Sequence, residues 1–178
     1  MVEVYVGFTL DIVHTGHLKV LEKAAQLGRV TIGVLSDKAV ISHRSLPLVK
    51  YEQRKRIALG LKGVDRVVEQ NEWSYVPNLL KYKPDYFVRG DDWKLNEPEL
   101  RDAVKNALDS YGGKLVETEH EIDVSNATDR FLRSQQMTSS LRLASLRRLI
   151  SAKKIVRFIE AHNPMSALIA ETLVIKKN

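Results

Sequence analysis

The chain has 178 residues, 44% of them hydrophobic and 28% charged, which is ordinary for a globular protein. It has no cysteine, which excludes disulfides and thiolate metal sites, and neither a secretory signal nor an apolar run long enough to span a bilayer, so we expect a cytoplasmic protein. The formal net charge of +6 indicates anionic partners, either nucleic acid or small anions such as a nucleoside triphosphate.

Strands and helices are predicted to alternate along the first 120 residues or so of the chain. Apolar, β-branched runs predict strands over residues 2–8, 29–35, 64–69, 86–88 and 114–117. Helix-face spacing and capping residues predict helices over residues 16–27, 37–41, 51–61, 74–82 and 98–111. Such alternation is typical of β–α–β units, so the predicted fold class is α/β, with a doubly wound parallel sheet.

The pattern changes near residue 141 to amphipathic helix rich in arginine. Helices are predicted over residues 141–150, 155–161 and 165–174. The chain therefore divides into a domain at residues 1–134 and a C-terminal helical tail at residues 135–178. We interpret the basic residues of the tail as solvated helix faces, because no stacking aromatic residues are interleaved with them, and expect no nucleic-acid partner.

Two histidines follow the first predicted strand directly. His14 and His17 flank Gly16 at the point where a strand passes into a helix. The start of a helix offers free backbone N–H groups and the positive end of its dipole, which suit a polyphosphate. Gly16 has no side chain, so a bulky ligand can approach the backbone closely. The alternative is that the two histidines only cap the helix.

Three polar segments are expected to meet at one edge of the sheet. Residues 9–17, 89–93 and 122–128 follow the first, fourth and fifth predicted strands. In a doubly wound sheet, ligands bind outside the carboxyl ends of the strands. The topology therefore predicts one site built from all three segments.

Two of these segments together resemble a known family. Residues 9–17 contain His-x-Gly-His and residues 89–93 read Arg-Gly-Asp-Asp-Trp. They resemble the HxGH and GDDW segments of the cytidylyltransferases, nucleotidyltransferases that include the glycerol-3-phosphate and ethanolamine-phosphate enzymes. The resemblance implies a Rossmann-like nucleotidyltransferase that uses CTP as co-substrate together with a divalent cation, Mg²⁺.

The resemblance also implies roles for individual residues. His14 and His17 would hold the triphosphate and stabilise charge as pyrophosphate leaves, and a basic residue of the following loop, Arg44 or Lys50, would cover the phosphates. The residues implied to contact the nucleotide are Phe8, Thr9, Gly16, Arg54, Arg89, Asp91, Trp93, Ser125 and Thr128. Asp92 is expected to be structural.

Two of these positions leave alternatives open. Asp11 either contributes a carboxylate to the metal or holds the turn. Arg54, in a segment similar to the Y-E-x-R of the family, either reaches a phosphate or is a surface arginine of its helix.

The segment after the fifth strand departs from the family pattern. The family has R-T-E-G-I-S-[ST]-T there, whereas this chain lacks the arginine and keeps hydroxyl groups at Ser125 and Thr128. Three carboxylates lie close together instead, at Glu119, Glu121 and Asp123. A carboxylate beside the acceptor could hold an ammonium group, which predicts an acceptor with a positive end; the alternative is that some of these acids are exposed strand-end residues.

The tail contributes a second resemblance. Residues 160–169 (Glu-Ala-His-Asn-Pro-Met-Ser-Ala-Leu-Ile) are similar to the start of a phosphoenolpyruvate mutase domain, whose barrel about 40 residues cannot supply. This points to phosphonate biosynthesis and to 2-aminoethylphosphonate as acceptor, as in the 2-aminoethylphosphonate cytidylyltransferase domains associated with such mutases.

The alternative acceptors are phosphocholine, phosphoethanolamine and glycerol-3-phosphate, and a non-catalytic nucleotide-binding regulator is the alternative of a different class. The expected partners are a nucleoside triphosphate, a small phosphonate or phosphate acceptor and, because relatives are commonly dimers, a second copy of the chain.

Overall fold

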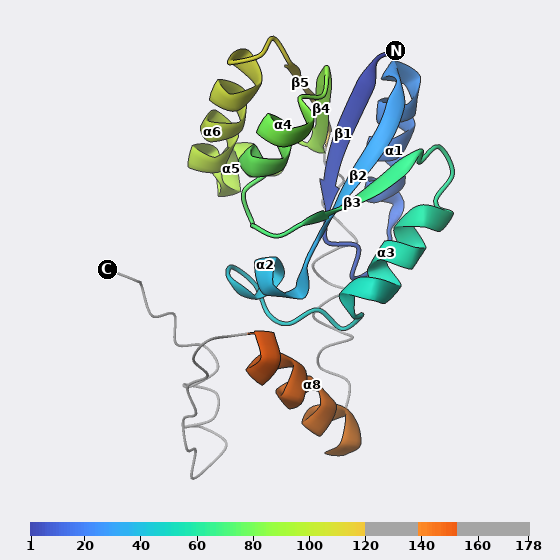
Figure 1. Ribbon diagram of the computed structural model, residues 1–178, viewed down its shortest axis with the longest axis vertical. Helices are drawn as coiled ribbons and strands as arrows, with labels where there is room; N and C mark the ends of the chain where they lie inside the picture. Colours follow the sequence, from blue (N-terminus) through green and yellow to red (C-terminus); the bar gives the residue numbers. More distant parts are fainter. Residues whose placement is uncertain (120–138, 153–178) are drawn as a thin grey trace.

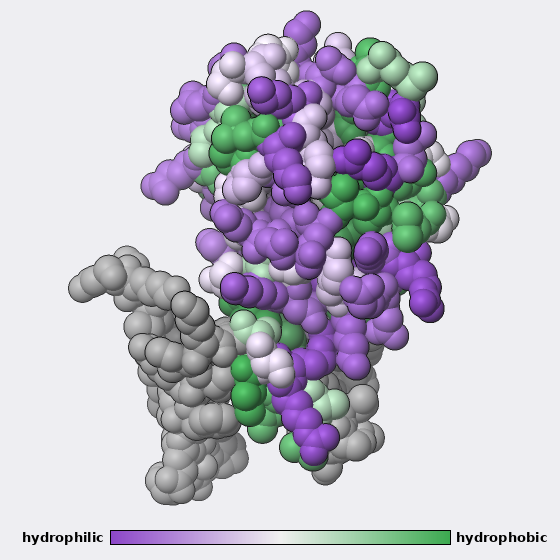
Figure 2. Space-filling view, in the orientation of Figure 1, coloured by the Kyte–Doolittle hydropathy of each residue, from purple (hydrophilic) through white to green (hydrophobic). Residues whose placement is uncertain are grey.

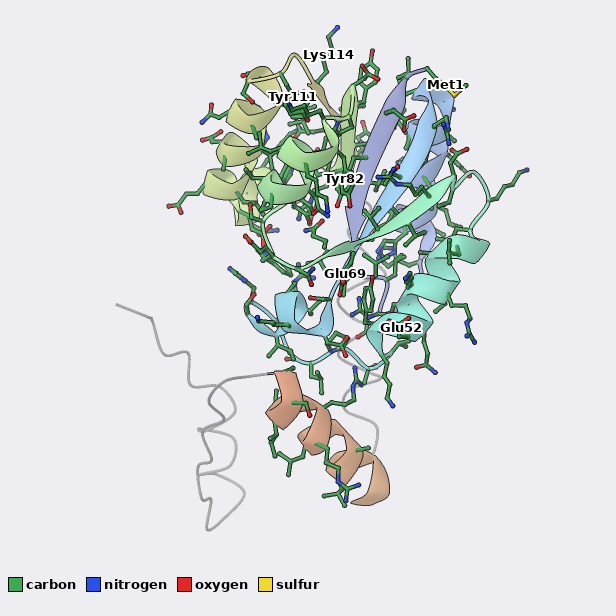
Figure 3. The ribbon with its side chains drawn as sticks, in the orientation of Figure 1. Met1, Glu52, Glu69, Tyr82, Tyr111 and Lys114 are labelled. Atoms are coloured by element: carbon green, nitrogen blue, oxygen red, sulfur yellow. The ribbon has the colours of Figure 1, made fainter. Side chains whose placement is uncertain are left out.

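The computed structural model describes residues 1–119 and 139–152. Five parallel strands form one sheet in the order β3-β2-β1-β4-β5 (Figure 1). The strands are β1 (Glu3–Phe8), β2 (Arg29–Leu35), β3 (Arg66–Gln70), β4 (Tyr86–Gly90) and β5 (Lys114–Thr118). This arrangement confirms the predicted doubly wound parallel sheet. Its carboxyl edge lies below the sheet in Figure 1, with Glu52 near that edge and Met1 and Lys114 at the opposite one (Figure 3).

Helices cover both faces of the sheet. The described helices are α1 (Thr15–Leu27), α2 (Asp37–Ile41), α3 (Tyr51–Gly60), α4 (Val76–Tyr82), α5 (Trp93–Asn96), α6 (Pro98–Asp109) and α8 (Ser139–Ala152). Helices α1 and α3 pack on one face, and α4, α5 and α6 pack on the other. None of the helices at residues 1–119 or 139–152 is long and apolar enough to cross a membrane.

The sequence of the central strand, β1, is almost wholly apolar because both of its faces are buried. Val4 and Val6 of β1 belong to the core under α1 and α3, whereas Tyr5 between them belongs to the core under α4 and α6. Successive side chains of a strand point to opposite faces, and helices bury both faces here. All three residues are fully buried, so β1 is the rigid base from which the following turn departs.

Some boundaries differ from the prediction. Helix α5 was not predicted, because four residues are too few to show a helical period. Helix α6 ends at Asp109, earlier than predicted, and Gly112 then turns the chain with a φ of +85°. Helix α8 extends two residues beyond each predicted end. The helices predicted over residues 155–161 and 165–174, and the boundary near residue 134, lie outside the described residues.

The surface of the described part is largely hydrophilic in the view of Figure 2. Hydrophobic residues show on α8, where Leu143 and Ile150 are about half exposed, at 49% and 51%. The packing of α8 on the domain therefore leaves much of its apolar surface uncovered.

A buried tyrosine links the sheet to α4. The Tyr5 hydroxyl donates to Gln70 Oε1 (3.0 Å) and accepts from Asn78 Nδ2 (2.8 Å). Gly33 leaves the room for this ring, because a Cβ there would lie 1.7 Å from the Tyr5 hydroxyl oxygen.

Replacing Gly33 by alanine is therefore expected to displace Tyr5 and lower the free energy of unfolding by about 1–3 kcal/mol. Urea denaturation measures this. Gly60→Ala is the matched control, since a Cβ at Gly60 meets nothing within 4 Å and its expected effect is within about 1 kcal/mol. Equal stability of the two variants would contradict the steric argument.

Candidate active site

The turn between β1 and α1 is unusual in its backbone. Leu10 adopts a φ of +55°, in the left-handed region, although its side chain is fully buried. Such a conformation costs roughly 1–3 kcal/mol and persists only where the surroundings enforce it. After it, His14 caps α1, and its carbonyl accepts from His17 N (3.0 Å) and Leu18 N (3.4 Å). The first turn of α1 therefore lies at the carboxyl end of the central strand.

The two histidine rings are in contact, tilted at 48° to each other. The ring centroids of His14 and His17 lie 3.9 Å apart, and Phe8 packs edge-on against His17 at 4.8 Å. The His14 backbone N–H donates to His17 Nδ1 (3.4 Å), so a neutral His17 carries its proton on Nε2. A Cβ on Gly16 would lie 3.0 Å from the His14 ring, so the glycine also leaves room for the histidine pair.

The protonation of His17 follows from this environment. Burial, and after it electrostatic interaction with the neighbouring His14, lowers the pKa of His17 to about 3. His17 is therefore neutral near pH 7 and acts as a hydrogen-bond donor through Nε2–H. A donor held rigidly in a site of low dielectric can stabilise developing negative charge without a charge of its own.

Asp11 anchors the loop at residues 42–50. Its Oδ2 accepts from Leu48 N (2.9 Å) and its Oδ1 from Val49 N (2.8 Å). These bonds give Asp11 a structural role, although at the loop rather than at its own turn as the alternative had it, and its role as a metal ligand stays a prediction. The described residues contain no group of three side chains suited to hold a metal ion. The Mg²⁺ of a nucleotide needs only one or two carboxylates besides the phosphates, so it would be held mainly by the substrate.

Arg54 is the largest departure from the expectations. It was expected either to reach a phosphate or to lie on the surface, but its side chain is fully buried. The guanidinium donates to the backbone carbonyl oxygens of Thr9 (2.6 Å), Leu35 (2.7 Å) and Val49 (3.0 Å). It also pairs with Asp37 Oδ1 (2.7 Å). All three nitrogens are used within the protein, so the surface interpretation is wrong and Arg54 braces the site from within.

The loop at residues 42–50 presents the expected cations. Lys50 is exposed at the start of α3, and Arg44 is exposed with its guanidinium 4.9 Å from the centre of the Trp73 ring. His43 stacks on the same ring at 5.0 Å. Trp73 was not identified from the sequence. The available signal was a large aromatic residue three positions after the end of β3, at the edge where the other segments meet.

The segment after β4 forms a second wall of the candidate site, besides the loop at residues 42–50. Trp93 is fully buried, and its Nε1–H donates to Glu117 Oε1 (2.9 Å). Arg89 lies 4.5 Å from the Trp93 ring and pairs with Glu97 (3.3 Å). Trp93 therefore supports the wall from behind, and Arg89 lies over it.

A charged pair behind this wall fixes it in place. Glu117 accepts two hydrogen bonds from Arg101, at 2.8 and 2.9 Å. These bonds, ahead of that from Trp93, hold the pKa of Glu117 at about 2, so the carboxylate stays charged at physiological pH. Asp91 follows β4 directly and is partly exposed, with its carboxylate 3.5 Å from Lys94 Nζ.

Four expected residues lie outside the described part of the chain: Glu121, Asp123, Ser125 and Thr128. Glu119 is described and exposed, directly after β5. The structure thus brings together the segments after β1 and β4 and the loop at residues 42–50. The contribution expected from residues 122–128 stays a prediction.

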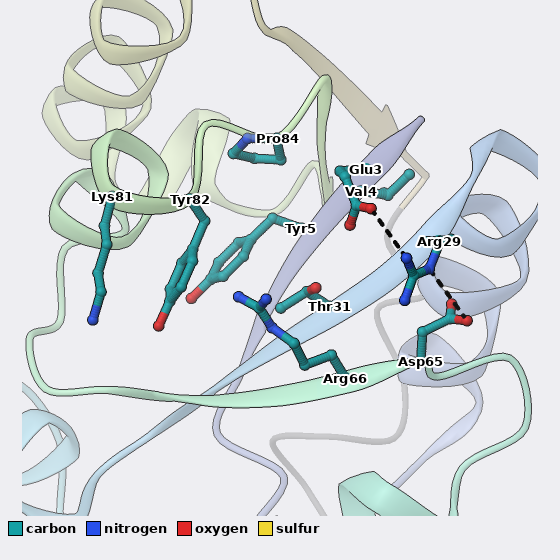
Figure 4. Close-up of a pocket in the computed structure, with 10 residues that line it drawn as sticks. All are labelled: Glu3, Val4, Tyr5, Arg29, Thr31, Asp65, Arg66, Lys81, Tyr82 and Pro84. Atoms are coloured by element: carbon teal, nitrogen blue, oxygen red, sulfur yellow. Dashed lines mark ion pairs between the residues drawn. The ribbon is translucent and has the colours of Figure 1, made fainter. Parts of the chain in front are cut away.

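A hollow of about 300 Å³ lies elsewhere on the molecule (Figure 4). Its lining includes Glu3, Arg29 and Asp65, which stand at or just before the starts of β1, β2 and β3. Arg66 and Tyr82 face each other across it, with the guanidinium 4.7 Å from the ring centre. The hollow belongs to the amino half of the sheet, whereas the histidines follow the carboxyl end, so it is not the candidate active site.

A family model described as cytidylyltransferase-like matches residues 5–158. The chain belongs to this family. It is accordingly a nucleotidyltransferase. This family membership confirms the expected reaction class.

Named relatives differ in what they make. The chain is 31% identical to an FAD synthase from Archaeoglobus profundus over 105 residues, which are 59% of this chain and 68% of that protein. It is 32% identical to the glycerol-3-phosphate cytidylyltransferase of Bacillus subtilis over 96 residues, 53% of this chain and 74% of that one. The ethanolamine-phosphate cytidylyltransferase of Arabidopsis thaliana is 30% identical over 97 residues, 51% of this chain and 23% of that one.

Among solved structures, the fold is similar to that of a lipopolysaccharide core biosynthesis protein from Thermoplasma volcanium. The TM-score is 0.58 at 25% identity, and the match covers 68% of this chain and 99% of that one. It supports the Rossmann-like assignment reached from the strand order.

The lowered pKa of His17 gives a test of the half-buried histidine pair. The unfolded chain binds a proton at His17 below about pH 6.5, whereas the folded chain does not until about pH 3, so stability is lost as pH falls through this window. Between pH 7 and 5, urea unfolding should show wild type losing about 1–2 kcal/mol more than His17→Gln. Parallel pH curves would contradict a His17 that the fold keeps neutral.

Arg54→Lys tests the bracing role. A lysine cannot serve four acceptors, so the free energy of unfolding without nucleotide should fall by about 2–4 kcal/mol. The matched control is Arg56→Lys, an exposed site on the same helix, with an expected change within about 0.5 kcal/mol. If Arg54 served only to bind phosphate, Arg54→Lys would leave the free energy of unfolding without nucleotide unchanged. That result would contradict the bracing role.

Proposed function

We propose that this nucleotidyltransferase transfers CMP from CTP to 2-aminoethylphosphonate, giving CMP-2-aminoethylphosphonate and pyrophosphate, in phosphonate biosynthesis. The observation that carries the nucleotidyl-transfer part is the contact between His14 and His17 at the start of α1, together with the exposed Arg44 and Lys50 of the loop at residues 42–50. The acceptor is argued from sequence, and the choice of CTP rests on the resemblance to the GDDW segment.

The proposed reaction needs positioning and charge stabilisation rather than covalent help. A phosphonate oxygen attacks the α-phosphorus of the nucleotide in line, forming a new P–O bond. The bond from the α-phosphorus to the bridging oxygen breaks, and pyrophosphate leaves with the electron pair. Mg²⁺, when bound with the triphosphate, neutralises part of the phosphate charge.

The residues of the chain would divide this work. His17 Nε2–H donates to a phosphate oxygen, and the positive end of the α1 dipole faces the phosphates, as negative charge moves to pyrophosphate. Lys50 and Arg44 supply positive charge from the loop, and Thr9 a hydroxyl donor. Asp91 is proposed to face the ribose and base, in front of the wall that Trp93 supports.

Two sequence features support 2-aminoethylphosphonate as the acceptor. The carboxylates at Glu119, Glu121 and Asp123 could hold the ammonium group of an amine-bearing acceptor. The similarity of residues 160–169 to the start of a phosphoenolpyruvate mutase domain points to phosphonate chemistry. Phosphocholine, phosphoethanolamine and glycerol-3-phosphate are the alternatives in the same class.

The relatives favour one further candidate. Several of the similar proteins are FAD synthases, and FAD joins an adenylyl group to flavin mononucleotide. For this chain that would mean ATP and flavin mononucleotide as substrates. The two candidates thus differ in both nucleotide and acceptor.

Pyrophosphate release with each pair of nucleotide and acceptor separates these functions. Purified full-length protein with Mg²⁺ receives CTP or ATP and, in turn, each of the five acceptors: 2-aminoethylphosphonate, phosphoethanolamine, phosphocholine, glycerol-3-phosphate or flavin mononucleotide. We expect turnover with CTP and 2-aminoethylphosphonate, and kcat/KM lowered about 10²–10³-fold in His14→Ala and in His17→Ala.

Lys23→Ala is the control, because Lys23 is exposed on α1, two turns after the histidines, and should retain full activity. Turnover with CTP and a phosphate acceptor alone would overturn the phosphonate assignment. Turnover with ATP and flavin mononucleotide would establish an FAD synthase instead. Nucleotide binding without any turnover would favour the non-catalytic regulator.

A further inference from the structure

The tail helix contacts the domain at α2 and at the loop beside the histidine turn. Figure 1 shows α8 beyond the carboxyl ends of the strands, next to α2. Arg148 of α8 pairs with Asp37 Oδ2 (2.9 Å) and donates from Nη1 to the backbone carbonyl oxygen of Leu48 (3.3 Å). Arg148 is 111 residues from Asp37 in sequence and 100 residues from Leu48.

Asp37 is shared between two arginines. Its Oδ1 binds Arg54, which is fully buried, and its Oδ2 binds Arg148, whose side chain is 18% exposed. A carboxylate can accept on both oxygens at once, and such charge-assisted bonds are stronger than neutral ones. Because Arg54 also binds the Thr9 carbonyl oxygen at the end of β1, a short chain of contacts runs from α8 to the turn that carries the histidines.

The loop at residues 42–50 is held from two sides where it returns to α3. Asp11 accepts from the N–H groups of Leu48 and Val49. On the carbonyl side, Arg54 donates to Val49 and Arg148 donates to Leu48. Three of these four hydrogen bonds come from the nucleotidyltransferase domain itself. The bond to the Leu48 oxygen comes from the tail.

We infer that Arg148 is a positioning residue for the nucleotide site: it holds the loop at residues 42–50 so that Arg44 and Lys50 stay at the phosphate position. The expected effect of Arg148 on CTP binding rests on the proposed function, whereas its expected effect on the position of the loop does not. It gives the described part of the tail a role in substrate binding.

The packing of α8 supports a positioning role over a purely stabilising one. Leu143 and Ile150 remain about half exposed, so the helix buries little apolar surface through them. Arg148 Nε is buried without a hydrogen-bond partner in the described residues, which offsets part of what the pair with Asp37 contributes. The contact is therefore specific in geometry but weak as a source of stability.

Trypsin cleavage within the loop at residues 42–50 tests whether Arg148 holds it. Trypsin cleaves after Arg44 and Lys50, and both residues are exposed. If Arg148 holds the loop, Arg148→Met should accelerate cleavage at these two sites, read by mass spectrometry of the 1–44 and 1–50 fragments. In the same variant the KM for CTP should rise about tenfold while kcat changes little, as expected for loss of a charge-assisted contact that orders a binding loop.

Arg147→Met is the matched control, because it removes the same charge from the neighbouring, exposed position of α8. Arg148→Lys keeps the charge opposite Asp37 and should restore part of the protection, which a merely structural loss would not do. Thermal melts check that all three variants are folded.

Two outcomes decide the inference independently of the proposed function. Equal cleavage in Arg148→Met and Arg147→Met would overturn the inference, whatever the substrates prove to be. Faster cleavage in Arg148→Met alone, in a protein whose wild type turns over no acceptor, would support the hold on the loop and overturn the proposed function instead.

Discussion

The architecture of the site depends on one buried arginine. Arg54 donates to carbonyl oxygens at the ends of β1 and β2 and in the loop at residues 42–50, and it pairs with Asp37 of α2. Backbone carbonyl groups at the ends of strands lose their neighbours in the sheet and need other donors once buried. A planar guanidinium with five N–H groups serves several such acceptors at once, which a lysine cannot. The left-handed turn at Leu10 is held beside this cluster.

The charges of the site are arranged in two layers. The ion pairs between Arg54 and Asp37 and between Arg101 and Glu117 lie inside or behind the walls, where they fix geometry. The neutral His17 and the exposed Lys50 take no part in these two ion pairs. A polyanion that binds here would meet hydrogen-bond donors already in position. It would also meet cations that take no part in the ion pairs of the walls. This is the arrangement that electrostatic catalysis of phosphoryl transfer requires.

The sequence predicted what depends on local pattern and missed what depends on tertiary contact. Apolar, β-branched runs predicted all five strands, and the position of the two histidines after the first of them predicted that they lie at the start of α1. The burial of Arg54 could not be predicted, because its neighbours Glu52, Gln53, Lys55 and Arg56 make the segment look like a solvated helix. Likewise, Trp73 comes near Arg44 and His43 only through the sheet order, which places the ends of β2 and β3 side by side.

The two walls of the site differ in what holds them, and this difference bears on how substrates enter. The wall after β4 stands on the buried Trp93 and the Glu117–Arg101 pair, so opening it would expose a large apolar ring and break charged hydrogen bonds. The loop at residues 42–50 is held mainly by hydrogen bonds to its backbone and carries exposed cations, so it opens at lower cost. Substrates are therefore expected to enter on the loop side, where the contact between Arg148 and Leu48 adds a tail-dependent hold to a movable wall.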